Sequence, residues 1–81
     1  MAVTLDMLPV RREARIVAVD WDALAPDEAK RLRAMGIDAG ATVAIEHRGI
    51  LAGRDPLALS VGRMTVALRR AHAKAMTVEA L

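Results

Sequence analysis

Hydrophobic and polar residues alternate over five short stretches of the chain. Alternation at every second residue is typical of a β-strand with one buried face, because successive side chains point to opposite faces of a sheet. In the first stretch Ala14, Ile16 and Ala18 share one side and are expected to face inward. The predicted strands span residues 11–20, 42–47, 57–61, 64–68 and 76–78.

One helix is predicted between the first two strands, where apolar residues recur at every third position instead of every second. Pro26 and the two acidic residues after it are typical of a first helical turn. Proline there lacks only an N–H group that would have no partner, and acids suit the positive end of the helix dipole. Ala29, Leu32 and Met35 then fall on one face, which predicts a short amphipathic helix.

Glycines mark where this helix and a later strand end. If Gly36 takes the left-handed conformation, Leu32 and Ile37 make the hydrophobic contact that accompanies a Schellman stop. Gly62-Arg63, with glycine first, matches a two-residue type II′ turn between the third and fourth predicted strands. An alanine- and arginine-rich stretch, residues 69–75, predicts one or two helical turns before the last strand.

Together these elements predict a mainly β protein with a single domain, residues 1–81. About five strands, with one short helix after the first and a helical turn before the last, favour a small, partly open barrel, because closure protects edge strands. Residues 3–9 are expected to lie as an apolar arm over one end, and residues 48–56 as a loop. The residues on one side of each predicted strand and helix form the expected core: Ile16, Leu32, Val43, Ile45, Leu57, Leu59, Val66 and Leu68.

The composition narrows the function more by exclusion than by pointing to a chemistry. The chain has 81 residues, 54% of them apolar, and Trp21 is its only aromatic residue, so the core is aliphatic and leaves little room for a large ligand cavity. The absence of cysteine excludes disulfides, thiolate metal sites and a cysteine nucleophile. A net charge of +2, without aromatic stacking residues, argues against a nucleic-acid platform.

No targeting or membrane segment is predicted. The first ten residues contain Asp6 and Pro9 and are followed by two arginines, which is unlike a secretory signal. No apolar run approaches the about 20 residues needed to cross a bilayer. We therefore expect a soluble, cytoplasmic protein that does not insert into a membrane.

Catalytic and metal-binding patterns are weak. His47 and His72 are the only histidines, and they lack the close spacing of metal ligands, although Glu46 and Asp55 lie near in sequence. Solvated histidines without a metal site are expected. Ser60 is the only serine and has no nucleophile pattern around it, so no enzyme activity is predicted.

Two features have both a structural and a binding interpretation. Trp21 either caps the barrel or anchors a partner, since tryptophan is enriched at interaction hot spots. The arginines are either a solvated face or a patch that recognises carboxylates. They are Arg31, Arg33, Arg69 and Arg70.

Read in order, several fragments resemble the FeoA family along nearly the whole chain. The amino-terminal pattern consists of Leu5, Leu8-Pro9, Ala14, Ile16 and Val19. The helix-to-strand element is Arg31-Leu32-Arg33-Ala34-Met35-Gly36-Ile37, then Gly40 and Val43. The last part is Asp55-Pro56-Leu57, Val61-Gly62, Val66-Ala67-Leu68-Arg69, Ala73, Met76 and Val78. Met35 stands where the family usually has leucine, Ala39 where it has a turn proline, and His72 where an acid is common.

This resemblance implies an SH3-like barrel and an accessory role in ferrous-iron transport, beside the FeoB permease and its cytoplasmic part. The partner surface is expected on the helix and the 48–56 loop, with Arg31, Arg33, Gly49 and Arg54 as candidate contacts. No cofactor is expected, weak self-association is left open, and transition-metal binding enters only through the family's link to iron. The alternatives are an SH3-like nucleic-acid module, which salt-dependent filter binding would reveal, and an iron-responsive regulator, which iron-titrated light scattering would reveal.

Overall fold

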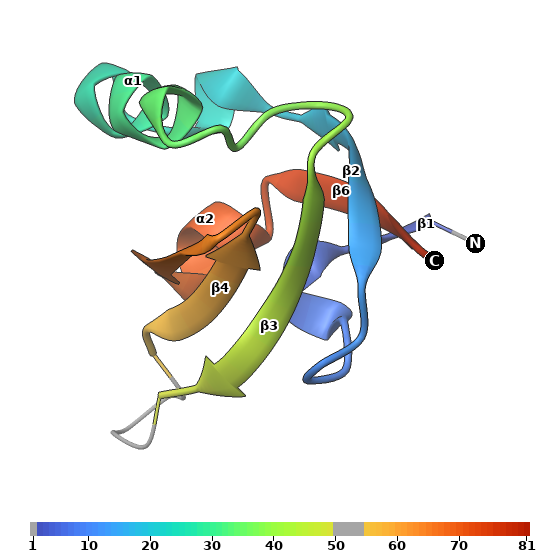
Figure 1. Cartoon of the computed structure of the whole chain (residues 1–81). Coiled ribbons are helices and arrows are strands. Elements are labelled where there is room, and N and C mark those ends of the chain that lie inside the picture. The colour runs from blue at the N-terminus through green and yellow to red at the C-terminus, as the bar shows by residue number, and fades with distance from the viewer. Residues whose placement is uncertain (1, 50–54) are drawn as a thin grey trace.

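The computed structural model describes residues 2–49 and 55–81 and shows a mainly β fold (Figure 1). Six strands and four short helical segments occur in this part of the chain. The strands are β1 (Ala2–Thr4), β2 (Ala14–Val19), β3 (Thr42–Arg48), β4 (Leu57–Val61), β5 (Met64–Leu68) and β6 (Met76–Ala80). The helical segments are η1 (Leu5–Met7), η2 (Trp21–Ala23), α1 (Pro26–Ala34) and α2 (Arg70–Ala73), of which η1 and η2 are 3₁₀ turns.

All strands belong to one antiparallel sheet, in the order β1-β6-β2-β3-β4-β5. The sheet curls around the core, and α1 lies at the end from which β3 starts (Figure 1). Among the described strands β1 and β5 are the two edges, so the sheet is not closed. All five predicted strands are present.

The prediction for residues 3–9 is wrong at the start and right further on. Residues 2–4 form a sixth strand, β1, in which Val3 pairs with Val78 of β6. Three residues are too few to show the alternation by which a strand is recognised. Leu5 and Leu8 are buried, so the rest of the segment does cover the core as expected.

The helix forms where it is predicted and ends by the predicted mechanism. Gly36 has φ of +90°, and its N–H donates to the carbonyl of Arg33 at 3.0 Å. The N–H of Ile37 donates to the carbonyl of Leu32 at 3.0 Å, which completes the Schellman pattern. Leu32 and Ile37 are both fully buried. The left-handed backbone explains why a glycine stands at this position.

A β-bulge in β2 overturns the predicted alternation there. Ile16 pairs with Val78 and Ala18 with the neighbouring Thr77, so Val17 is an extra residue in the ladder. An extra residue shifts every later side chain to the other face. Ala18 is therefore exposed rather than inward, and Val19 packs against the core instead.

The predicted core is confirmed, because all eight of its residues are buried. The buried side chains are aliphatic throughout, and Trp21 packs against their margin as a half-buried residue. No helix among the described residues is long and apolar enough to span a membrane.

Candidate partner-binding surfaces

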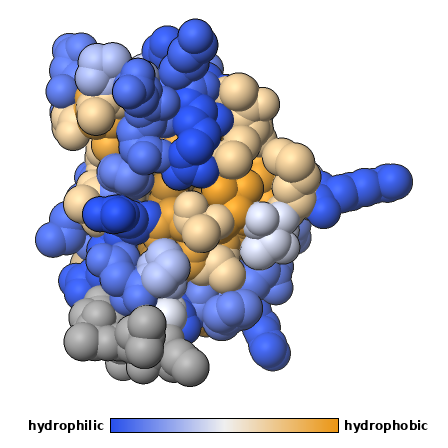
Figure 2. Space-filling model, turned by 90° about the vertical axis from the view of Figure 1, so that its left-hand side faces the viewer, coloured by the Kyte–Doolittle hydropathy of each residue, from blue (hydrophilic) through white to orange (hydrophobic). Residues whose placement is uncertain are grey.

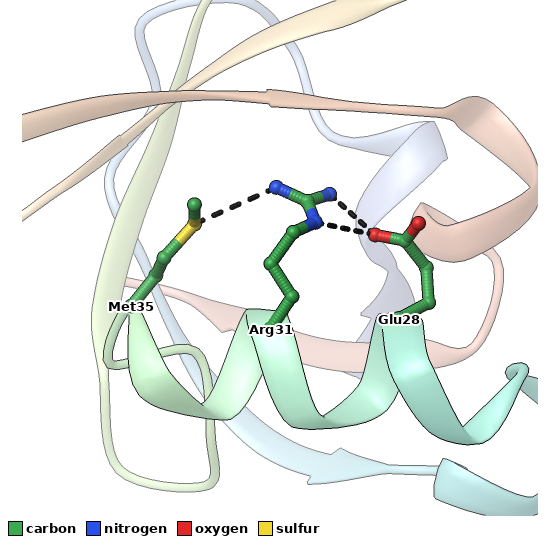
Figure 3. A network of polar contacts seen from close by, with 3 residues as sticks. All are labelled: Glu28, Arg31 and Met35. Carbon is green, nitrogen blue, oxygen red and sulfur yellow. Dashed lines mark hydrogen bonds and ion pairs between the residues drawn. The ribbon is translucent and has the colours of Figure 1, made fainter.

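Arg31 lies on an exposed face of α1 and is held by residues of the same helix. Its Nε donates to Oε1 of Glu28 at 2.6 Å, and its Nη1 contacts the sulfur of Met35 at 3.7 Å (Figure 3). The spacings of three and four residues place these side chains on one helix face. An exposed pair of this kind contributes only about 0.2–0.5 kcal/mol, so a partner carboxylate could displace Glu28 at little cost.

Arg33 lies over the ring of Trp21, with its guanidinium carbon 4.3 Å from the ring centroid. This is a cation–π contact, and it joins the η2 turn to α1. Trp21 packs against the core as well. The structural interpretation of Trp21 is thus confirmed, while its role as a partner anchor stays a prediction.

Gly49 lies at the other end of β3, in an open groove of about 500 Å³. A Cβ atom on Gly49 would lie 2.5 Å from the carbonyl oxygen of Asp55, so the two chain segments approach closely only because this residue is glycine. The Asp55 carboxylate in turn accepts a hydrogen bond from the backbone N–H of Arg70 at 2.7 Å, at the start of α2. The groove is lined by His47, Arg48, Gly49, Asp55, Pro56, Leu57, Ala58, Thr65 and Ala67.

The predicted contact residues do not form one surface. α1 and the Gly49 end of β3 lie at opposite ends of the molecule, separated by the length of β3 (Figure 1). Arg31 and Arg33 are therefore apart from Gly49, and Arg54 lies outside the described residues. A partner could contact either end, but among the described residues Gly49 does not lie beside the α1 arginines.

Arg48 has a role that the sequence analysis missed. Its Nη2 donates to the backbone carbonyls of Asp6, at 3.1 Å, and Leu8, at 2.7 Å. The contact ties the end of β3 to the segment that follows β1, about 40 residues earlier in the sequence. No local sequence pattern predicts such a contact, because the acceptors are backbone carbonyls, which every residue has.

The two histidines occupy different environments. His47 is exposed beside the groove, as expected. His72 on α2 is half-buried, and its Nδ1 is buried without a hydrogen-bond partner among the described residues, so the expectation of a solvated His72 is wrong. Oδ1 of Asp6 is in the same situation. The cause for His72 is that α2 lies against η1, the turn that contains Asp6, and the adjacent Ala73 is fully buried.

Within residues 2–49 and 55–81, no three histidine, cysteine or acidic side chains gather as a metal site would require. His47 lies on β3 and His72 on α2, and two imidazoles on different elements do not form a chelating set, so we expect no tight stoichiometric complex with ferrous iron. Anaerobic titration calorimetry would check this. A one-to-one complex that His47→Ala or His72→Ala abolishes would contradict it.

Comparison with known proteins decides the family. The family model described as the FeoA domain matches residues 3–80. The chain belongs to the FeoA family. Among curated proteins, none matches the sequence significantly.

Solved structures agree with this FeoA assignment. FeoA of Stenotrophomonas maltophilia complexed with zinc is 36% identical, with a TM-score of 0.76 over 95% of this chain and 89% of that one. FeoA of Chlorobium tepidum is 26% identical, with a TM-score of 0.84 over 98% of this chain and 70% of that one. The relative from S. maltophilia is described as an SH3 domain protein, and the expected SH3-like fold is confirmed.

A manganese-dependent transcriptional repressor is 20% identical, with a TM-score of 0.81 over 99% of this chain. The FeoA-family chain covers only 42% of that repressor's length. At this identity the likeness extends to the fold alone, and it supports no regulatory role.

Figure 2 shows the side of the molecule that bears α1 and the β4–β5 hairpin. Apolar residues form the centre of this face, and hydrophilic side chains surround them. An apolar centre with a polar rim is the usual composition of a protein contact surface.

Proposed function

We propose that this FeoA-family chain is a small cytoplasmic accessory protein of ferrous-iron uptake, which acts by binding the cytoplasmic part of a FeoB-type permease. The observation that carries the proposal is the FeoA match over residues 3–80. The relative with 36% identity adds support, because it is described as a candidate activating factor of bacterial ferrous-iron transport.

The geometry supports action by contact and not by catalysis. The core is filled by aliphatic side chains, and the described residues contain no cluster of metal-ligating groups. The same relative was solved with zinc, so weak metal binding by this chain is part of the proposal but not its basis. We infer that the protein is not an enzyme.

The proposed contact surface is the exposed face of α1 together with Trp21. Arg33 is the better of the two arginine candidates, since its stacking on Trp21 pre-orients the guanidinium without occupying its N–H donors in a described hydrogen bond. Arg31 must first break its hydrogen bond to Glu28. A stacked, planar guanidinium suits recognition of a carboxylate on the permease.

Replacing both Arg31 and Arg33 with alanine is expected to weaken binding to the purified cytoplasmic part of the permease and to reduce its salt dependence. Charges at the rim of an interface act mainly on the association rate. The melting temperature should change little, because both side chains are exposed and their contacts are each worth under about 1 kcal/mol.

A matched control removes two other exposed positive charges, Arg12 and Lys74, in the variant Arg12→Ala/Lys74→Ala. Net charge is then equal in the two variants. Surface plasmon resonance at low and moderate salt should show the loss only for the α1 variant. Equal binding by both variants would remove the arginines from the contact surface.

A further inference from the structure

β5 is an edge strand that pairs on one side only. Its five residues form an uninterrupted antiparallel ladder with β4, from Leu57–Leu68 to Val61–Met64. The sheet order ends at β5, and none of the other described strands lies on its outer side. The opposite edge, β1, has only three residues.

The register shows which backbone groups of β5 face outward. Gly62 has φ of +59° and Arg63 is not among the residues with positive φ, so the two-residue turn makes Val61 and Met64 a hydrogen-bonded pair. Bonded and non-bonded pairs alternate along an antiparallel ladder. Thr65 and Ala67 are therefore in non-bonded pairs with β4, and their N–H and C=O groups point to the open edge.

The edge lacks the usual protection against pairing. Residues 64–68 contain no charged residue and no proline, and the ladder with β4 has no bulge. Natural edge strands commonly carry a charged residue, a proline or a bulge that prevents a further strand from pairing. In the described part of the chain no backbone hydrogen bond from another element reaches Thr65 or Ala67. The edge can accept a strand.

Charges at the two ends of β5 limit which strand can pair with its open edge. Arg63 precedes β5 and Arg69 follows it; both are exposed, and neither side chain has an ion pair or hydrogen bond within the described residues. A second copy paired antiparallel about Val66 would place Arg63 opposite Arg69 twice. Like charges directly opposite each other destabilise a strand pair.

We propose that the outer edge of β5 binds an extended peptide segment that carries an acidic residue at each end, six positions apart. The segment adds a strand to the sheet through Thr65 and Ala67, and its acids lie opposite Arg63 and Arg69. Main-chain bonds give such strand addition its affinity, and side chains give its specificity. This inference does not depend on the permease being the partner.

The groove beside β5 offers a place for side chains of the added strand. His47, Ala58 and Ala67 are consecutive partners across β3, β4 and β5, so they form one row on the outer face. Ala58, Ala67 and Thr65 line the groove of about 500 Å³ and are small. The residues of the segment opposite Ala67 and Thr65 extend this row, and medium-sized apolar side chains there can lean over the alanines.

The probe is the acetylated, amidated heptapeptide Glu-Thr-Val-Thr-Val-Thr-Glu, added to the ¹⁵N-labelled full chain at low salt. We expect amide shifts centred on residues 64–68, and slower hydrogen exchange at the amides of Thr65 and Ala67. The same peptide with arginine at both ends should bind at least about fivefold more weakly, because two favourable charge pairs become repulsive. The variant Arg63→Glu/Arg69→Glu should reverse this preference.

Three results would overturn the proposal. One is the absence of any peptide-dependent change at β5. Another is equal affinity for the acidic and the arginine peptide. The last is a dimer in sedimentation, with Thr65 and Ala67 protected before any peptide is added, which would assign the edge to a second copy of the chain. The two peptides are compared on the unaltered protein, so the test holds even if the double variant does not fold.

Discussion

Replacing Leu68 with alanine is expected to lower the free energy of unfolding by about 2–5 kcal/mol. Leu68 is fully buried at the end of β5 and pairs with Leu57, which is also fully buried. Its truncation leaves a cavity among aliphatic side chains. The melting temperature of a domain of this size should fall by about 4–8 °C for each kcal/mol.

Met64 provides a control on the same strand, since it is 48% exposed. Met64→Ala should change stability by no more than about 0.5 kcal/mol. Leu32→Ala on α1 should resemble Leu68→Ala, because Leu32 is also fully buried. Urea unfolding of the three variants measures the differences. If the two leucine variants unfold with the parent, the assignment of inward faces is wrong.

Gly49→Ala is expected to destabilise the fold by about 1–3 kcal/mol, the usual cost of forcing extra atoms into a packed site. The added Cβ would meet the carbonyl oxygen of Asp55 at 2.5 Å and that of Pro56 at 2.7 Å. Both obstacles are backbone atoms, so no flexible side chain can move aside. The backbone at Asp55 must therefore shift. The Asp55 carboxylate, which accepts a hydrogen bond from the backbone N–H of Arg70, moves with it.

The amide signal of Arg70 distinguishes this mechanism from a general loss of stability. We expect it to move in Gly49→Ala, because its hydrogen bond to Asp55 is disturbed. Thr65→Ser, which alters the same groove without adding atoms near Asp55, should leave both the Arg70 signal and the melting temperature nearly unchanged. A Gly49→Ala protein with the parent's stability and Arg70 signal would contradict the close approach.

The elements set by local chemistry were predictable from the sequence. The helix from Pro26 and its Schellman end depend on residues within one or two turns, and the β4–β5 hairpin depends on Gly62-Arg63. Local rules of this kind are independent of the rest of the fold.

Features that depend on distant contacts were not predictable. The bulge at Val17 becomes visible only when β2 is paired with β6. Arg48 binds backbone carbonyls about 40 residues away, which any sequence could supply. The separation of Arg33 from Gly49 follows from the course of β3 through the fold. Whether any of these residues contacts a partner stays a prediction.

Ferrous-iron uptake tests the central claim most directly. Radiolabelled ferrous iron would be measured under reducing conditions in cells that have the permease and lack only this chain. The account predicts that uptake falls, and that the full chain supplied in trans restores it while permease levels stay constant. Normal uptake in cells without the chain would contradict its role in transport.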